Sequence, residues 1–578
     1  TQQFIVNYDL PLNKIPVLSF VKSVYSYTGN YSWMRSSDAL SQITDASNMT
    51  YQLGNTIQNS SVHKINTTLN LDLLYKYVGL TAKKPAAKAA APKAAPPKPG
   101  EKITSNQAPA TDGNAFVNGL IGVATSVKNI QINYSETSGT ALPGYLPSIG
   151  FFGTSKPTLG FIFGSQDADV RYEAARMGYL TNYPEFNQNF TQVRNTVLNL
   201  TATVDLFPDL RIDLNATRTY SNSFSEQYDV TDGIYNPRSP YDYGSFDVST
   251  ILIKTAFSAS DVTGSEAFDQ MRANRLLIAD RLATQRYGTS EFPRYGDPGV
   301  PTGEFATANA GYPVGFGKNS QEVLLPSFMA AYSGTDASKV STSAFRDTPL
   351  PNWLVKYTGL MRYKYFKERF KRFSLQHGYT SRYNVNAYRS NFEYDQNPNG
   401  QDNGGAGNFF ARNIISNINL SEQFNPLIRV EFEMQNSIRL NGEIKKDRML
   451  NMSFDNNLLT EVKGNEYIIG IGYRLKDVTI NSALADNPTN VIKSDINFKV
   501  DFSWRQNETI VRYLDYDNNQ LGGGQDIWSI QFRADYAFSK NLTAIFYYDH
   551  SFSKAVISTA YPLTNIRSGF TLRYNFGN

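Results

Sequence analysis

The C-terminal half of the chain alternates apolar and polar residues over unusually long runs. One face of such a run carries Ile496, Phe498, Val500, Phe502 and Trp504, and the residues between them include Asp495, Lys499, Asp501 and Arg505. A period of two places these sets on opposite faces of a β-strand. The runs extend for about 10 to 14 residues, nearer a membrane-crossing strand than a soluble strand of about five or six. The pattern predicts strands with one face in lipid and one in water.

A soluble β-sandwich also alternates, with its apolar face turned inward. Here the polar faces carry many full charges, and the chain holds 36 Phe and 37 Tyr at a polar mean hydropathy of −0.40. This combination favours a water-filled lumen and an aromatic girdle. Apolar runs of about 18 residues are absent, which excludes a helical membrane protein. With no cysteine, a disulfide-stapled fold and a thiolate metal site are excluded too.

Turn signals set the expected topology. We expect short periplasmic turns at Phe207–Asp209, Phe424–Leu427, Lys463–Asn465 and Ser539–Asn541, and long outer connectors near 29–62, 137–192, 221–351, 390–410, 478–492 and 553–565. This scheme predicts an all-β fold, a transmembrane antiparallel β-barrel with roughly 17 strands. The first strand, near Phe4–Tyr8, and the last, 566–576, would both run toward the periplasm. Because complete bacterial barrels have even strand numbers, we expect a larger barrel with at least one further upstream strand.

Five regions follow from this scheme. They are transmembrane strands over 1–80, a Lys/Ala/Pro-rich periplasmic linker over 81–113, strands with a Gly/Pro/aromatic loop over 114–220, an extracellular cap over 221–351, and C-terminal strands over 352–578. We expect the linker to be a tether, with binding of an anionic cell-wall polymer as an alternative. The cap contains a predicted helix over Ser265–Tyr287, with Thr263 and Glu266 as a capping box. The chain does not begin with Met, so we interpret it as a mature product or a piece of a longer chain.

Catalytic chemistry is not indicated. The three histidines, His63, His377 and His550, fit no metal-binding spacing, and no nucleophile-elbow or phosphate-loop motif occurs, so we expect no enzyme, no catalytic residue and no cofactor. A weak calcium candidate is formed by Asp515, Asp517, Asn519 and Asp526, with a glycine-rich turn at Gly522–Gly524 as the alternative. The basic and aromatic cluster at Lys364–Phe373 is interpreted as a turn at the membrane surface rather than a nucleic-acid site.

Alternation also assigns individual residues to faces. The predicted pore-lining residues are Arg429, Glu431, Glu433, Lys499, Asp501, Arg533 and Asp535. The predicted lipid-facing residues are Phe432, Phe498, Phe502, Phe532, Tyr536, Phe570, Tyr574 and Phe576. The mixed signs of the first set argue against a narrow ion-selective ring.

Several stretches of the chain resemble one known family. They are Lys128–Gly153 (KNIQINYSETSGTALPGYLPSIGFFG), Arg171–Gln188 (RYEAARMGYLTNYPEFNQ), Leu450–Val478, Asp501–Gln520, Arg533–Lys554 and Ile566–Asn578 (IRSGFTLRYNFGN). These stretches are similar to the C-terminal region of the SprA (Sov) family, the gliding-motility and type IX secretion translocons of Bacteroidota. The resemblance covers most of 115–578.

The resemblance implies a very large single-chain barrel in the cell outer membrane that exports folded proteins bearing a C-terminal secretion domain. It implies four kinds of partner besides lipid: secreted cargo, a PorV-type shuttle barrel at a lateral gate, a periplasmic plug protein, and the N-terminal strands of the same barrel. It implies no nucleic acid. Two alternatives stay open, which are a nutrient porin or TonB-dependent-type transporter and a surface adhesin barrel.

Overall fold

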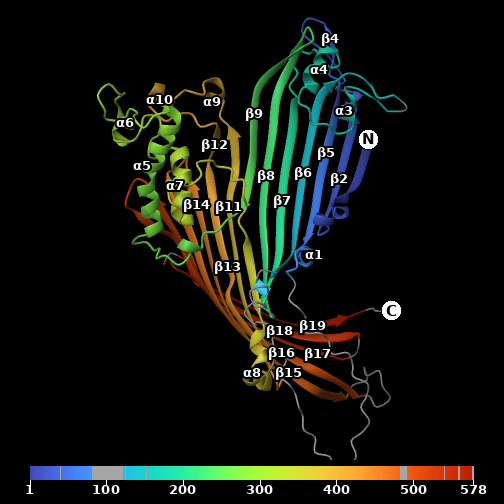
Figure 1. Cartoon of the computed structure of the whole chain (residues 1–578), viewed down its shortest axis with the longest axis vertical. Coiled ribbons are helices and arrows are strands. Elements are labelled where there is room, and N and C mark those ends of the chain that lie inside the picture. Colours follow the sequence, from blue (N-terminus) through green and yellow to red (C-terminus); the bar gives the residue numbers. More distant parts are fainter. Residues whose placement is uncertain are drawn as a thin grey trace, which may run out of the picture.

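The computed structural model describes residues 1–38, 41–80, 122–123, 125–150, 153–207, 209–481, 491–538, 541–557 and 560–575 (Figure 1). The predicted linker at 81–113 and the predicted lipid-facing Phe576 lie outside these described residues. No helix within the described ranges is both long and apolar enough to cross a bilayer.

One sheet of 17 strands makes up most of the molecule, and every pairing in it is antiparallel. Its strands are β1 (Gln2–Leu10), β2 (Val21–Met34), β5 (Asn55–Asn70), β6 (Val127–Tyr145), β7 (Asn189–Phe207), β8 (Leu210–Thr231), β9 (Ile234–Ser249), β10 (Asn352–Tyr357), β11 (Phe370–Ser390), β12 (Asn413–Ile415), β13 (Asn417–Met434), β14 (Ile438–Ser453), β15 (Leu458–Asn481), β16 (Val491–Tyr513), β17 (Asn519–Ala537), β18 (Leu542–Ala555) and β19 (Leu563–Tyr574). A small separate hairpin contains β3 (Gln42–Thr44) and β4 (Thr50–Gln52). The predicted all-β antiparallel fold is confirmed.

Two pairs of strands share a position, or stave, in the wall. β9 and β10 both lie between β8 and β11, one following the other down the stave, and β12 and β13 both pair with β11. The 17 strands therefore occupy fifteen staves. Within the described residues, β1 is in register only with β2, and β19 only with β18. The wall is open at both edges, and because β1 and β19 run in the same direction, antiparallel closure requires an odd number of further strands.

Connectors divide the wall into two ends. The turn end carries short connections such as those between β7 and β8 and between β17 and β18, whereas the opposite end, which we call the insertion end, carries the insertion between β6 and β7 and the connector between β11 and β12 (Figure 1). Four predictions about connectors need correction. Phe424–Leu427 is no turn but lies within β13, where the register slips between Phe424 and Ile428, and Lys463–Asn465 pairs continuously inside β15. The third concerns 478–492, predicted as an outer connector: β15 runs the whole height of the wall to Asn481, and Asn481 pairs with Val491 of β16 at the turn end.

The fourth correction concerns the region predicted as transmembrane strands over 1–80, which ends in a helix. β5 ends at Asn70, and the chain continues as helix α1 (Leu71–Tyr77). Remaining short elements are η1 (Pro11–Lys14), η2 (Pro16–Leu18), η5 (Gly359–Arg362), α8 (Lys364–Arg369), α9 (Phe392–Gln396) and α10 (Asp402–Gly405).

The cap begins later than predicted. β8 and β9 form a hairpin whose turn residues, Asp232 and Gly233, both have positive φ, so the excursion runs from 250 to 351 rather than from 221. It leaves the wall after Ser249 and returns at Asn352, and the Leu350 amide donates to the Ser249 carbonyl at 2.9 Å. The cap is thus inserted within a single stave.

The predicted cap helix exists as α5 (Glu266–Tyr287), but its N-cap is Ser265, whose hydroxyl accepts from the Phe268 amide. Thr263 instead bonds Asp261 in the preceding turn. The other elements of the cap are η4 (Ile253–Thr255), α6 (Glu304–Ala308) and α7 (Gln321–Ser333). Helix α7 was not expected, because ten of its residues are buried and it shows no polar face.

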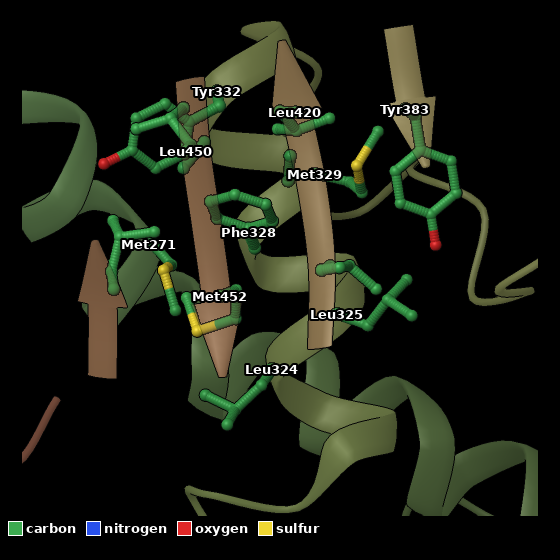
Figure 2. Close-up of a cluster of buried hydrophobic side chains, with 14 of the residues drawn as sticks. Met271, Leu324, Leu325, Phe328, Met329, Tyr332, Tyr383, Leu420, Leu450 and Met452 are labelled. Atoms are coloured by element: carbon green, nitrogen blue, oxygen red, sulfur yellow. The ribbon is translucent and has the colours of Figure 1, made fainter. Parts of the chain in front are cut away.

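Helices α5 and α7 pack on the wall rather than only on each other. Figure 2 shows side chains of α7, including Phe328, beside Leu420, Leu450 and Met452 of β13 and β14. From α5, Phe268, Met271 and Ile278 are buried, whereas Leu276 is 42% exposed. The cap and five staves therefore share one hydrophobic core.

A second insertion lies between β6 and β7. Within the region 114–220, where we predicted strands with a Gly/Pro/aromatic loop, β6 continues to Tyr145, and the insertion covers 146–188 with α3 (Leu159–Ile162) and α4 (Val170–Arg176). It packs against the insertion end of β2 and β5–β9, around Tyr31, Leu142, Phe190 and Tyr228.

Candidate channel-lining surface

The predicted pore-lining residues lie on one face of the wall. Cross-strand partners share a face. Cross-strand pairing joins one row of residues across five strands: Glu433, Arg439, Gly472, Lys499 and Arg533. The next row on the same face is Glu431, Asn441, Gly470 and Asp501. Arg429 and Asp535 belong to the same face by alternation within β13 and β17. We call this surface the charged face.

Charges on the charged face are compensated locally. Glu433 forms ion pairs with Lys371, Arg372 and Arg439 at 3.0–3.6 Å. Further pairs join Lys445 to Glu466, Arg505 to Asp447, and Lys499 to Asp501. Exposed pairs contribute little to stability. Their effect is a hydrated surface of mixed sign, which neither selects one ion nor offers an apolar cargo a place to adhere.

The predicted lipid-facing residues that the structure describes lie on the opposite face, where Tyr536 is buried at 7% exposed. Register joins Phe432, Leu440, Ile471, Val500 and Phe532 in one row, and Phe570 pairs with Phe546 of β18. Toward the turn end this face exposes a contiguous set of large apolar side chains, which we call the apolar belt: Ile444, Tyr467, Ile469, Ile471, Tyr473, Val500, Phe502, Ile530, Phe546, Phe570, Leu572 and Tyr574. Such a surface is costly in water but suits the hydrocarbon core of a membrane.

Toward the insertion end, the same face is covered by the cap. Four charged residues occupy apolar-phase positions there and are almost fully buried: Glu422, Arg448, Glu461 and Arg512. Arg448 pairs with Glu422 at 2.9 Å and donates to the carbonyl and the hydroxyl of Thr255 in the cap. These charges break the apolar phase of the strands, a signal that could have located the docking area from the sequence.

The calcium candidate residues do not converge. Asp515 and Asp517 lie in the turn between β16 and β17, where Asp515 pairs with Lys318 at 3.0 Å and Asp517 pairs with Arg272, both cations belonging to the cap. Asp526 lies farther along β17, in register with Gln506. Across the described ranges no cluster of three or more His, Cys, Asp or Glu side chains could hold a metal ion. The turn carboxylates fasten the cap instead. Gly522–Gly524, the alternative turn, lies inside β17.

The basic and aromatic cluster at 364–373 is a connector, as predicted. Helix α8 joins β10 to β11 at the turn end (Figure 1). Phe366 packs against Phe370 and Phe373, with ring centroids 5.8 and 5.0 Å away, and Phe373 stacks on Phe432 of the apolar belt face. The aromatic residues of the cluster thus extend the apolar face as far as the turn end of the wall.

No protein-family model and no curated protein matches the chain. Among solved structures, the FrpB iron transporter from Neisseria meningitidis is 8% identical with a TM-score of 0.26, and the match covers 93% of this chain and 58% of that one. The ferric-catecholate import receptor Fiu from E. coli is 7% identical with a TM-score of 0.26, covering 96% and 63%. The RagAB peptide transporter is 6% identical with a TM-score of 0.24, covering 93% and 51%. The chain spans less than two thirds of each of these structures.

The fold and the two faces define a class of protein. Long antiparallel strands with a hydrated, charge-compensated face opposite an exposed apolar belt form a wall of the outer-membrane β-barrel type.

Proposed function

We propose that this chain is part of the wall of a protein-conducting channel in the outer membrane, a type IX secretion translocon of the SprA kind that also supports gliding motility. The wall contributes no bond chemistry and no cofactor. It provides a wide hydrated passage that holds no cargo tightly, and the energy for transport comes from elsewhere.

The open wall carries this proposal. Fifteen staves do not close on themselves within the described residues, and unpaired strand edges cannot face lipid because their backbone groups lack hydrogen-bonding partners. Further strands must therefore complete the barrel, and barrel diameter grows with strand number. The charged face suits a lumen wide enough for folded cargo, and the sequence stretches that resemble the translocon family supply the specific role.

Partners follow from the same proposal. The free edges of β1 and β19 would pair with the N-terminal strands of the same barrel, and a PorV-type shuttle would meet a lateral gate in the wall. A periplasmic plug protein would close the turn end, and secreted proteins with a shared C-terminal domain would pass through the lumen.

Depletion of this protein in the source cell, followed by quantitative proteomics of medium, surface and periplasm, tests the proposal. We expect proteins with one shared C-terminal domain to accumulate in the periplasm. Re-expression of the wild-type chain should restore export, while a chain with Ile530→Arg in the apolar belt should not. Intact export together with failed uptake of a nutrient would instead identify a transporter. Intact export with loss of surface attachment would identify an adhesin.

A further inference from the structure

A polar groove of about 1000 Å³ lies on the belt side of the wall, beneath the insertion at 146–188. Its floor crosses five staves, β5 to β9, and is formed by His63, Glu136, Arg194, Asn222 and Asp242. Register places these residues side by side: His63 pairs with Glu136, and Arg194 with Asn222. The volume is in the range of small-molecule binding sites, about 300–1,000 Å³.

The roof of the groove is held firmly. Gln166 in the insertion receives a hydrogen bond from Thr140 at 2.9 Å and donates to Asn59 at 3.1 Å, which ties the insertion to β6 and β5. Arg171 of α4 is 8% exposed and pairs with Glu226 of β8 at 2.7 Å. At Gly29, a Cβ atom would lie 2.1 Å from the Phe163 carbonyl, so the insertion sits directly on β2. The groove is therefore a preformed feature of the wall.

The polar groups of the floor have fixed positions. The Nε and Nη2 atoms of Arg194 each lie 3.0 Å from an oxygen of the Glu136 carboxylate, and Tyr134 donates to that carboxylate at 2.7 Å. The His63 ring is held by the Tyr25 hydroxyl at 2.9 Å from Nδ1. The Asp242 carboxylate accepts no hydrogen bond from any side chain in the described ranges.

The balance of these groups indicates the ligand chemistry. Glu136 already compensates the charge of Arg194, and the second carboxylate, Asp242, would repel an added phosphate. Amide, guanidinium and carboxylate groups together donate to and accept from hydroxyl groups, and Tyr27 and Phe224 line the groove with ring faces suited to an apolar sugar face. A neutral polyhydroxylated ring meets all of these requirements.

An apolar patch on the same face, next to the groove, identifies the source of that ring. One register step toward the turn end, His63 and Glu136 give way to Ile65 and Tyr134, and Tyr134 pairs with Leu198 of β7. Ile130, Ile132 and Leu200 continue this apolar surface. A molecule with its headgroup in the groove would lay its acyl chains along these residues.

We propose that this groove binds the saccharide headgroup of an outer-leaflet glycolipid, with its acyl chains on the adjoining patch of Ile65, Ile130, Ile132 and Leu200. The inference rests on the proposed placement of the wall in the outer membrane. It adds a specific lipid contact at the boundary between the insertion and the bilayer, where the overhanging insertion shields the headgroup from bulk water.

Native mass spectrometry of the whole polypeptide, extracted from its own membrane and titrated with purified lipooligosaccharide, tests the proposal. The matched variants are Asn222→Leu, on the groove face of β8, and Asn195→Leu, on the other face of the neighbouring β7. We expect Asn222→Leu to lower glycolipid binding about tenfold, the loss of one or two hydrogen bonds. Asn195→Leu should bind like the wild type. Arg194→Gln provides a second groove variant, and protease resistance of the wall verifies that each variant is assembled.

Three outcomes would overturn the proposal. Equal glycolipid binding by both Asn variants and Arg194→Gln would remove the groove as the site. If phosphatidylglycerol binds as strongly as the lipooligosaccharide, the sugar is not the group that the groove recognises. Full competition by the deacylated core oligosaccharide would assign the groove to a free saccharide. A wall that does not assemble in the membrane would contradict the proposed function. A wall that assembles and exports its cargo, but binds glycolipid equally well with and without the groove residues, would contradict this inference alone.

Discussion

The guanidinium group of Arg512 lies 3.2 Å from the carboxylate of Glu461, and both side chains are almost completely buried, at 0% and 1% exposed. The pair joins β16 to β15 beneath the cap. The same Nη2 atom reaches into the cap, where it donates to the Ser260 hydroxyl and to the Asp261 carbonyl, each at 2.9 Å. Two strands of the wall are thus linked to the start of the cap through one arginine.

Replacing Arg512 by Met should release the cap from the wall. The change leaves Glu461 buried and unpaired, which typically costs about 3–5 kcal/mol. We expect faster proteolysis within 250–351, measured by limited trypsin digestion of the membrane-embedded protein. Arg512→Met combined with Glu461→Leu should recover much of the protection, because no lone charge is then buried. A double variant as sensitive as the single one would contradict this account.

Charge placed on the apolar belt should prevent assembly, whereas charge on the charged face should not. Ile530 and Gln531 are neighbours on β17 and both are exposed, on opposite faces. Ile530→Arg should cost about 2–4 kcal/mol in mid-bilayer. Gln531→Arg should be tolerated, because its register partner is Asp501. The amount of folded protein in the outer membrane measures both, and equal yields would reverse the assignment of faces.

The turn carboxylate Asp515 should act through the cap rather than through calcium. Lys318 and Asn319 already engage it at 3.0 and 2.7 Å. We expect Asp515→Asn to loosen the cap in limited proteolysis, and a chelator to leave the wild-type digestion pattern unchanged. Protection that rises when calcium is added back would restore the calcium hypothesis.

The cap should be less stable at neutral than at mildly acidic pH because of Glu322. Burial at the start of α7 raises the pKa of this carboxyl above its ordinary value of 4.5, and Arg286 offsets only part of the effect. A carboxyl whose pKa is higher in the folded than in the unfolded protein contributes its stability in full below the unfolded-state pKa. That contribution is lost as the pH rises through the folded-state pKa. Glu322→Gln should therefore protect the cap at neutral pH.

The matched control for this prediction is Glu304→Gln, in the first turn of α6, where the carboxylate is exposed. Thermal unfolding of the cap followed by proteolysis at several pH values measures both variants. If Glu322→Gln leaves the pH dependence of the cap unchanged, the burial of Glu322 does not govern it.

The sequence predicted the two faces because alternation depends only on neighbouring residues. Phe432 and Glu433, or Asp501 and Phe502, fall on opposite faces in any straight strand. Turns were harder to predict. Asn425–Pro426 and Gly464 carry turn-forming residues, yet in the wall the first is absorbed as a bulge and the second continues a paired strand.

The cap and its docking area depend on contacts far apart in the chain. Helix α7 contains Pro326 and is buried nearly all round, so no amphipathic period reveals it. Glu422 and Arg448 stand out in the sequence only as charges within the apolar phase of their strands, and the cap that covers them comes from a distant part of the chain. The floor of the groove combines residues from five staves, each unremarkable in its own strand. Only the register brings them together.

The insertion of the cap within one stave makes the wall depend on it at a particular place. β10 is six residues long and supplies Trp353 and Val355 to the belt side, between β8 and β11. Those residues reach their position only after the chain has passed through the whole cap. The folded cap holds its two ends together, since the Leu350 amide donates to the Ser249 carbonyl, and β10 thereby begins beside the end of β9. A cap that failed to fold would leave a gap of six residues on the belt side of the wall, so the folding of the cap completes this stave.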